Sequence, residues 1–312
     1  MLIIDISHEM TQRKGIIMKK NSNKHIAYLF LLPWIIGFLS LTLVPMVVSL
    51  YYSFNDFNMI SDPVFVGFDN YIRMFTRDPH FQTALRVTLL YVFVSVPLQI
   101  LVSLVLAFLL NKSVLFLSTI RAAFYVPSLL GGSVAVAILW RQVFGANGIV
   151  NMLLYTIGLD QFADISWIAD PRFSLGSLIF LRMWQFGSPM IIFLAGIKQV
   201  PVSYLEAAQI DGATRFTQIT KIILPLLSPI ILFNLVMQII SAFRVFTEAF
   251  VISGGQGGVM GSLLVYTIHI YDVAFRQLRM GYASALSWFL VLMVGLFTII
   301  AFKLSNKHVH YE

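Results

Sequence analysis

The sequence predicts an all-α membrane protein with six transmembrane helices. Of its 312 residues, 58% are hydrophobic and only 11% are charged, and the mean hydropathy is +0.84. A soluble domain needs more charge on its surface, so that class is excluded. Six segments reach the length of about 20 apolar residues that crosses a bilayer as a helix. They are 27–52, 85–110, 122–144, 174–197, 226–252 and 283–302.

The distribution of positive charge predicts the orientation of these helices, because cytoplasmic loops carry more Lys and Arg than external loops. One set of loops, with both termini, carries twelve: Arg13, Lys14, Lys19, Lys20, Lys24, Lys112, Arg121, Lys198, Arg215, Lys221, Lys303 and Lys307. The alternate loops carry six: Arg73, Arg77, Arg141, Arg172, Arg276 and Arg279. Both termini are therefore expected in the cytoplasm. The net charge of +7 follows membrane topology and does not indicate nucleic-acid binding.

The predicted order of parts follows from these segments. A polar, basic arm (1–26) precedes the first transmembrane helix and its external loop (27–80). A core of five helices (81–304) and a short cytoplasmic tail (305–312) complete the chain. The arm is not expected to be a cleavable signal peptide, because the apolar run after it is too long. Met18 is an alternative start to Met1.

Prolines interrupt the apolar segments at Pro33, Pro45, Pro97, Pro127 and Pro189. Such positions allow kinks in a bundle that moves, but simple tolerance of proline in membrane helices explains them equally well. The pair Gly131-Gly132 permits close contact between helices.

Several kinds of chemistry are excluded. The chain has no cysteine, which removes disulfides, thiolate catalysis and zinc–thiolate sites. No catalytic pair of residues occurs at membrane depth, so we expect no enzyme and no metal site. The glycine run 254–258 is not followed by Lys-Ser or Lys-Thr, so it is no phosphate-binding loop.

A semi-polar stretch, 203–225, separates the fourth and fifth apolar segments. Ser203 and Glu206 have the spacing of a capping box, which predicts a helix beginning near Tyr204. Gly212 is expected to end that helix in the left-handed conformation. Asp211 is expected to cap a second helix that ends before Pro225. The result would be two short helices meeting at a bend.

The same stretch carries a longer pattern: EAA, three residues, Gly, nine residues, Ile, one residue, Leu-Pro. This pattern resembles the EAA loop of ABC importer permeases, and EAAQIDGA resembles the sugar permease branch. The resemblance implies the type I importer fold and a coupling helix, within the loop 198–225, that sits in a cleft of a cytoplasmic ATPase. The implied coupling residues are Glu206, Ala207, Ala208, Asp211, Gly212, Ile222, Leu224 and Pro225.

The resemblance also implies partners. Two copies of an ABC ATPase would bind ATP and Mg, so this chain itself would hold no cofactor and act as a transport subunit. A second, homologous permease would complete a heterodimer, and an external solute-binding protein would deliver the sugar. The complex would lie in the bacterial cytoplasmic membrane and move its solute by alternating access.

Polar residues at membrane depth are costly, so they predict the path of the solute. The expected lining is Trp184, Gln185 and Ser188 on the fourth segment and Gln238, Ser241, Arg244, Val245 and Glu248 on the fifth. Within each segment the spacing places most of these side chains on one face of a helix. An indole with amide and hydroxyl groups suits a sugar, because apolar ring faces stack on the indole and the sugar hydroxyls need paired donors and acceptors.

Two alternatives stay open. Arg244 and Glu248 lie four residues apart, which predicts a structural ion pair, but the same residues could meet an acidic oligosaccharide. The chain could also be an ion-coupled secondary transporter of a small polar solute. That class uses paired carboxylates or an inverted repeat, whereas few acids lie within the segments.

Overall fold

The computed structural model describes residues 24–111 and 117–305. Its contacts divide the chain into two units, one ending at Tyr52 and the other beginning at Ser53. Helices dominate both units, which confirms the all-α class. Most of the predicted N-terminal arm and nearly all of the tail lie outside the described residues.

The first unit contains one long apolar helix. It consists of α2 (Lys24–Phe38), the π-helical η1 (Leu39–Leu43) and α3 (Val44–Ser53). The π turn precedes Pro45, which has no amide to donate and which clashes with the carbonyl one turn back. The amide of Val44 bonds to the carbonyl of Leu39, five residues back. The wider turn absorbs the proline, and the helix continues.

The second unit begins with two short strands that the all-α prediction did not include. In antiparallel pairing, β1 (Asn55–Asp56) places Asn55 opposite Phe65 of β2 (Val64–Phe65). Asn70 fixes this corner, because its side-chain amide donates to the carbonyls of Ser53 (3.0 Å) and Asn55 (2.9 Å). The strands therefore form only a local two-stranded sheet.

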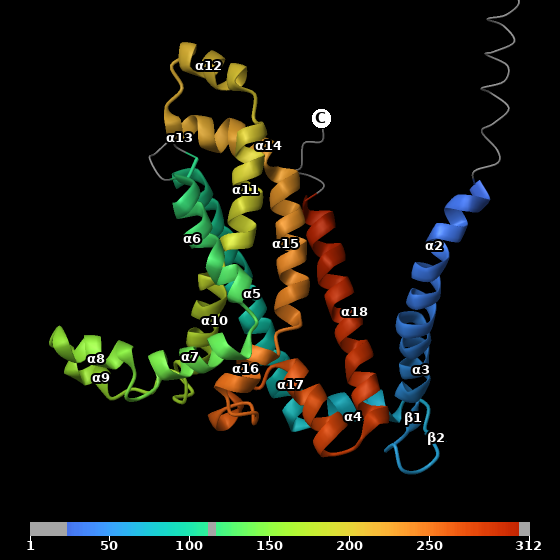
Figure 1. The fold of residues 1–312 in the computed structure, drawn as a ribbon. Coiled ribbons are helices and arrows are strands. Elements are labelled where there is room, and N and C mark those ends of the chain that lie inside the picture. The colour runs from blue at the N-terminus through green and yellow to red at the C-terminus, as the bar shows by residue number, and fades with distance from the viewer. Residues whose placement is uncertain (1–23, 112–116, 306–312) are drawn as a thin grey trace, which may run out of the picture. The chain divides into compact units, whose positions relative to one another are not determined.

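The helices of the second unit follow in chain order. They are α4 (Asp69–Thr76), α5 (Pro79–Leu109), α6 (Leu117–Leu130), α7 (Val134–Phe144), α8 (Ile149–Thr156), α9 (Asp160–Ala163), α10 (Ser174–Trp184), α11 (Gly187–Gln199), α12 (Val202–Ile210), α13 (Arg215–Gln218), η2 (Ile219–Ile223), α14 (Leu224–Leu226), α15 (Ser228–Phe243), α16 (Thr247–Ile252), η3 (Val259–Gly261), α17 (Tyr266–Tyr271), η4 (Asp272–Arg276) and α18 (Met280–Ser305). In Figure 1, α12 and α13 lie at one end of this unit, and α4, α16 and α17 lie at the other.

Among the described residues, four helices are long and apolar enough to cross a membrane: Tyr28–Ser53, Pro79–Leu109, Ser228–Ile252 and Met280–Ser305. Two bent pairs bring the number to six if each pair is one span. One pair, α10 with α11, bends by 42°. The other pair, Ser118–Leu130 with Val134–Thr156, bends by 100°. The predicted third segment, 122–144, is therefore not one straight helix, because Gly132 turns the chain with a φ of +76°.

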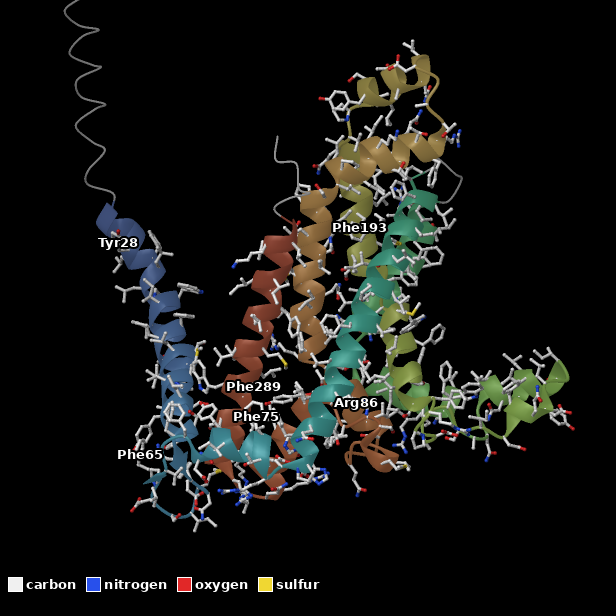
Figure 2. The ribbon with its side chains drawn as sticks, turned by 180° about the vertical axis from the view of Figure 1, so that it is seen from behind. Tyr28, Phe65, Phe75, Arg86, Phe193 and Phe289 are labelled. Carbon is white, nitrogen blue, oxygen red and sulfur yellow. The ribbon has the colours of Figure 1, made fainter. Side chains whose placement is uncertain are left out.

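Helix α5 lies at the centre of the second unit and packs against α10, α11 and α15. Four small or amide side chains on its inner face are almost fully buried: Thr88, Ser95, Gln99 and Ser103. Apolar residues pack around it in two clusters. The larger cluster includes Phe81, which contacts Phe75 and Phe289, and Figure 2 shows the latter two together. The smaller cluster surrounds Phe193 on α11, nearer to α12 (Figure 2).

Candidate functional site

The first helix of the EAA loop (198–225) begins earlier than predicted. Helix α12 starts at Val202, and Pro201 is its N-cap with no side-chain hydrogen bond. Ser203 therefore lies inside the first turn, where its backbone is already helical and its hydroxyl does not cap. The predicted capping box between Ser203 and Glu206 is wrong, because the rigid backbone of Pro201 sets the helix start instead.

The predicted stop at Gly212 is confirmed. Gly212 has a φ of +78°. The amide of Ala213 bonds to the carbonyl of Ala208 at 2.8 Å, and the amide of Gly212 bonds to the carbonyl of Gln209 at 3.0 Å. These two bonds form a Schellman motif, which satisfies the last carbonyls of the helix.

The second helix is capped by Thr214 and not by Asp211. The Oγ1 atom of Thr214 accepts from the amide of Thr217 at 3.3 Å. Asp211 already ends α12 with near-helical angles, whereas an N-cap requires the extended angles that Thr214 has. The helix also does not end before Pro225. The π turn η2 precedes that proline, as η1 precedes Pro45, and the chain stays helical through α14.

The EAA loop has an anchored face and a free face. Leu205 packs with Ile219 and Ile223 onto the smaller core cluster. The predicted coupling residues divide accordingly: Glu206, Ala207, Asp211 and Gly212 are exposed, whereas Ala208, Ile222, Leu224 and Pro225 are partly buried. Exposed apolar side chains, which the sequence analysis did not single out, lie beside them at Val202, Ile210 and Phe216. The exposed face thus combines two carboxylates with apolar side chains at the end of the unit.

Three helix breaks lie close together in the second unit. They separate α6 from α7, α10 from α11, and α15 from α16. A Cβ atom at Gly131 would lie 2.7 Å from the side chain of Gln185, and one at Gly132 would lie 3.8 Å from Oε1 of Glu248. The predicted continuous helix faces are therefore wrong, because both the fourth and the fifth segments are interrupted where the polar residues lie.

The break between α10 and α11 frees the carbonyl of Gln185, which needs other donors. Pro189 has no amide for the carbonyl of Gln185, four residues back. Nε2 of Gln99 (2.9 Å) and Oγ of Ser128 (3.0 Å) donate to that carbonyl instead. The carbonyl of Phe186, which already accepts from the amide of Met190 at 3.0 Å, also accepts from the hydroxyl of Ser103 at 3.1 Å. Side chains of α5 and α6 thus complete the backbone hydrogen bonding that lipid cannot supply.

Arg182 holds the breaks together at a polar centre, defined as Gln99, Arg182, Gln238 and Ser241. Nε of Arg182 donates to Oε1 of Gln99 at 2.8 Å. Its other nitrogens donate to Oγ of Ser241 at 3.1 Å and to Oε1 of Gln238 at 2.5 Å. The guanidinium is almost fully buried, and every acceptor is neutral. Gln99 joins this centre to the break at Gln185, a link that no local spacing reveals.

A cavity of about 330 Å³ adjoins the polar centre. Four of the predicted pathway residues line it together with Arg182, namely Ser241, Arg244, Val245 and Glu248. Gln238 meets Arg182 beside it. In the part of the chain that the structure describes, Arg244 and Glu248 form no ion pair with each other. The predicted pair is wrong, because Arg244 is the C-cap of α15 and Glu248 lies in the first turn of α16, after the break.

The other predicted pathway residues lie outside this cavity. The ring of Trp184 lies 6.0 Å from that of Trp140, in an aromatic group with Phe144 and Phe180. Ser188 is exposed, and its amide donates to Oγ of Ser128 at 2.9 Å. The structure therefore brings the residues of the fifth segment to one cavity and separates them from Trp184.

A second buried polar group, which sequence reasoning missed, lies at the end opposite α12. Oδ2 of Asp78 lies 2.8 Å from Nε2 of His269 and accepts from the hydroxyl of Tyr282 at 2.6 Å. Oδ1 of Asp78 caps α5 by accepting from the amides of His80 and Phe81. Burial alone would raise the pKa of Asp78, but these hydrogen bonds hold that pKa well below its usual range. The group joins three elements that are distant in sequence.

The comparisons with known proteins agree with this architecture. Residues 84–309 match the model of the family described as "Binding-protein-dependent transport system inner membrane component". The probable ABC transporter permease protein YesP of Bacillus subtilis is 48% identical, covering 91% of this chain and 92% of YesP. The lactose transport system permease protein LacF of Rhizobium radiobacter is 32% identical, covering 78% of this chain and 82% of LacF.

A solved structure shares the fold. A crystal structure of a bacterial alginate ABC transporter, in complex with a periplasmic protein bound to an alginate pentasaccharide, contains a chain with a TM-score of 0.78. That chain is 24% identical, and the match covers 93% of this chain and 96% of the other. The family match, the close relative and the shared fold agree on one assignment. The chain belongs to the binding-protein-dependent transport system inner membrane components, as a multi-pass permease subunit of an ABC importer.

Proposed function

We propose that this permease imports a sugar, a di- or oligosaccharide, across the bacterial cytoplasmic membrane by alternating access. Relatives named for the transport of lactose and of arabinooligosaccharides support a carbohydrate substrate. The cavity beside the polar centre supports it as well, because hydroxyl groups of a sugar need paired donors and acceptors within the membrane.

The observation that carries the proposal is the exposed face of α12. It presents Glu206 and Ala207 on a helix that is fixed on its inner side by Leu205 and ended sharply at Gly212. Exposed Ile210 and Phe216 add apolar surface that favours a protein partner over water. We assign this face to a cleft of a cytoplasmic ABC ATPase.

The remaining partners follow from that assignment. Two ATPase copies bind ATP and Mg and hydrolyse the nucleotide, so this chain serves as the transport subunit and not as the enzyme. A second, homologous permease completes a heterodimer, and an external solute-binding protein delivers the sugar. Closure of the ATPase dimer favours one state of the permease pair, and this difference in binding moves the equilibrium between inward- and outward-facing states.

Cross-linking tests the proposal, and the absence of native cysteines makes an introduced thiol unique in the chain. Ala207→Cys in the complete importer should cross-link to a cysteine placed in the ATPase cleft. ATP-driven sugar uptake by proteoliposomes should then stop, and it should resume after reduction. Gln256→Cys, exposed between α16 and η3 at the opposite end, is the matched control and should not cross-link.

Two results would contradict the proposal. One is that Ala207→Cys never reaches the ATPase in any nucleotide state. The other is that an ion gradient without ATP drives uptake, which would instead favour a secondary transporter.

A further inference from the structure

We propose that the cavity at the break between α15 and α16 binds a carboxylate, so that the imported sugar is acidic and bears a uronate group. This inference rests on the proposed function and specifies its substrate class. The cavity is lined by Arg182, Ser241, Arg244 and Glu248, among other residues.

The cavity residues carry an unbalanced positive charge. The guanidinium of Arg182 donates only to neutral groups, those of Gln99, Gln238 and Ser241. Two arginines and one glutamate line the same space, which leaves one positive charge without a counter-charge among the cavity residues. An uncompensated charge is costly at membrane depth. One carboxylate on the solute would offset it.

Arg244 also has N–H donors that no other side chain of the described residues occupies. Within the described ranges, its guanidinium forms no ion pair and no side-chain hydrogen bond, and the side chain is exposed to the cavity. The carboxyl end of α15 favours a cation at this position, but it does not occupy the N–H groups of the guanidinium. Those groups form a planar fork that matches the two oxygens of a carboxylate.

The other groups of the cavity fit the rest of a sugar acid. Glu248 and Ser241 can accept from ring hydroxyls, and Ser241 is already oriented by Arg182 at 3.1 Å. A volume of about 330 Å³ lies within the range of about 300–1,000 Å³ that is typical of small-molecule sites. The site therefore suits one acidic sugar unit of a longer chain.

A competition in proteoliposomes containing the complete importer tests this inference. The probe is a mixture of di- to tetrasaccharides from pectin and alginate, which bear uronates, and from starch and arabinan, which are neutral. Mass spectrometry of the vesicle lumen then identifies the sugars that ATP accumulates. We expect uronate-bearing sugars to dominate.

Variants separate the carboxylate site from a structural role. Arg244→Gln should lower uronate uptake by about tenfold or more through a higher KM, and Arg244→Lys should recover part of the loss. Glu248→Gln, which removes the opposing charge, should lower the KM for the uronate. Arg276→Gln, at an exposed arginine paired with Asp272 outside the cavity, is the matched control.

The outcomes are distinct. Accumulation of neutral sugars alone, or uronate uptake unchanged in Arg244→Gln, would overturn this inference and leave the proposed function standing. Failure to accumulate any sugar with ATP would contradict the proposed function itself, and the carboxylate site with it.

Discussion

The EAA loop and the polar centre are built in opposite ways. The loop is held by bonds between near neighbours in sequence, such as those of Gly212 and Thr214, and its outer face is exposed. The polar centre is held by bonds between Gln99, Arg182 and Gln238, which lie on three different helices, and Gln99 and Arg182 are almost fully buried. A local pattern therefore identifies the first region, whereas only the folded chain defines the second. Substitutions should consequently act on binding in the loop and on folding in the centre.

The largest expected effect is that of Arg182→Met. The apolar side chain would leave the buried Oε1 of Gln99 and the partly buried Oε1 of Gln238 without their donor, at a cost of roughly 3 kcal/mol in the free energy of unfolding. The Tm of the detergent-purified protein should fall clearly. Arg172→Met, at an exposed arginine that pairs with Asp170 and lies over the ring of Phe173, is the control. An unchanged Tm in Arg182→Met would show that the polar centre does not hold the helices together.

Gly212→Val should uncouple ATP hydrolysis from uptake without unfolding the protein. A β-branched residue in the left-handed conformation costs about 1–2 kcal/mol, which would displace the end of α12. Uptake per ATP hydrolysed should fall several-fold. Gly158 has a φ of +77° in the same kind of helix end, after α8, so Gly158→Val imposes equal strain far from the loop. Equal losses of coupling in both variants would contradict a special role for α12.

The Asp78 group should make stability depend on pH. Because the pKa of Asp78 is lower in the folded protein than the usual value of about 3.9, the ionised carboxylate stabilises the fold fully above about pH 4. That stabilisation should be lost progressively as the pH falls below this value. Asp78→Asn should lower the Tm at pH 7 and flatten its dependence on pH. A parallel pH profile in wild type and variant would refute the assignment.

The smallest expected effect distinguishes two caps in the EAA loop. Thr214→Ala removes the side-chain cap of α13 and should cost about 1 kcal/mol of local stability. Ser203→Ala removes no cap and should cost less than about 0.5 kcal/mol. Hydrogen exchange of the amide of Thr217 measures the difference. Faster exchange of α12 amides in Ser203→Ala would instead indicate that Ser203 does cap α12.

The sequence predicts much of the fold because its signals are local. The length of each apolar segment predicts a membrane span, and Gly212 predicts the end of a helix. Each prediction depends on residues of one short segment alone. Pro225 misleads, because the π turn before it lets the helix continue, as another π turn does before Pro45. Helix starts are misplaced where a neighbouring residue already has the extended angles that a cap needs.

The membrane site is predicted only in part, because its three breaks have different origins. Pro189 signals the break at Gln185, and Gly131-Gly132 signals the one before α7. The break after Arg244 has neither residue. There Thr267, from a later helix, donates its hydroxyl to the carbonyl of Val245. A periodicity argument assumes an unbroken helix, so it could not foresee that Arg244 and Glu248 would separate.

The donors supplied to Gln185 and Phe186 limit how the protein can deform. Twisting α11 against α5 and α6 would remove Gln99 and Ser128 from the carbonyl of Gln185 and Ser103 from that of Phe186, in lipid that supplies no replacement water. Helices α5, α6 and α11 should consequently move as one rigid body during transport. A displacement of α12 would then be transmitted through α11 to the helix breaks.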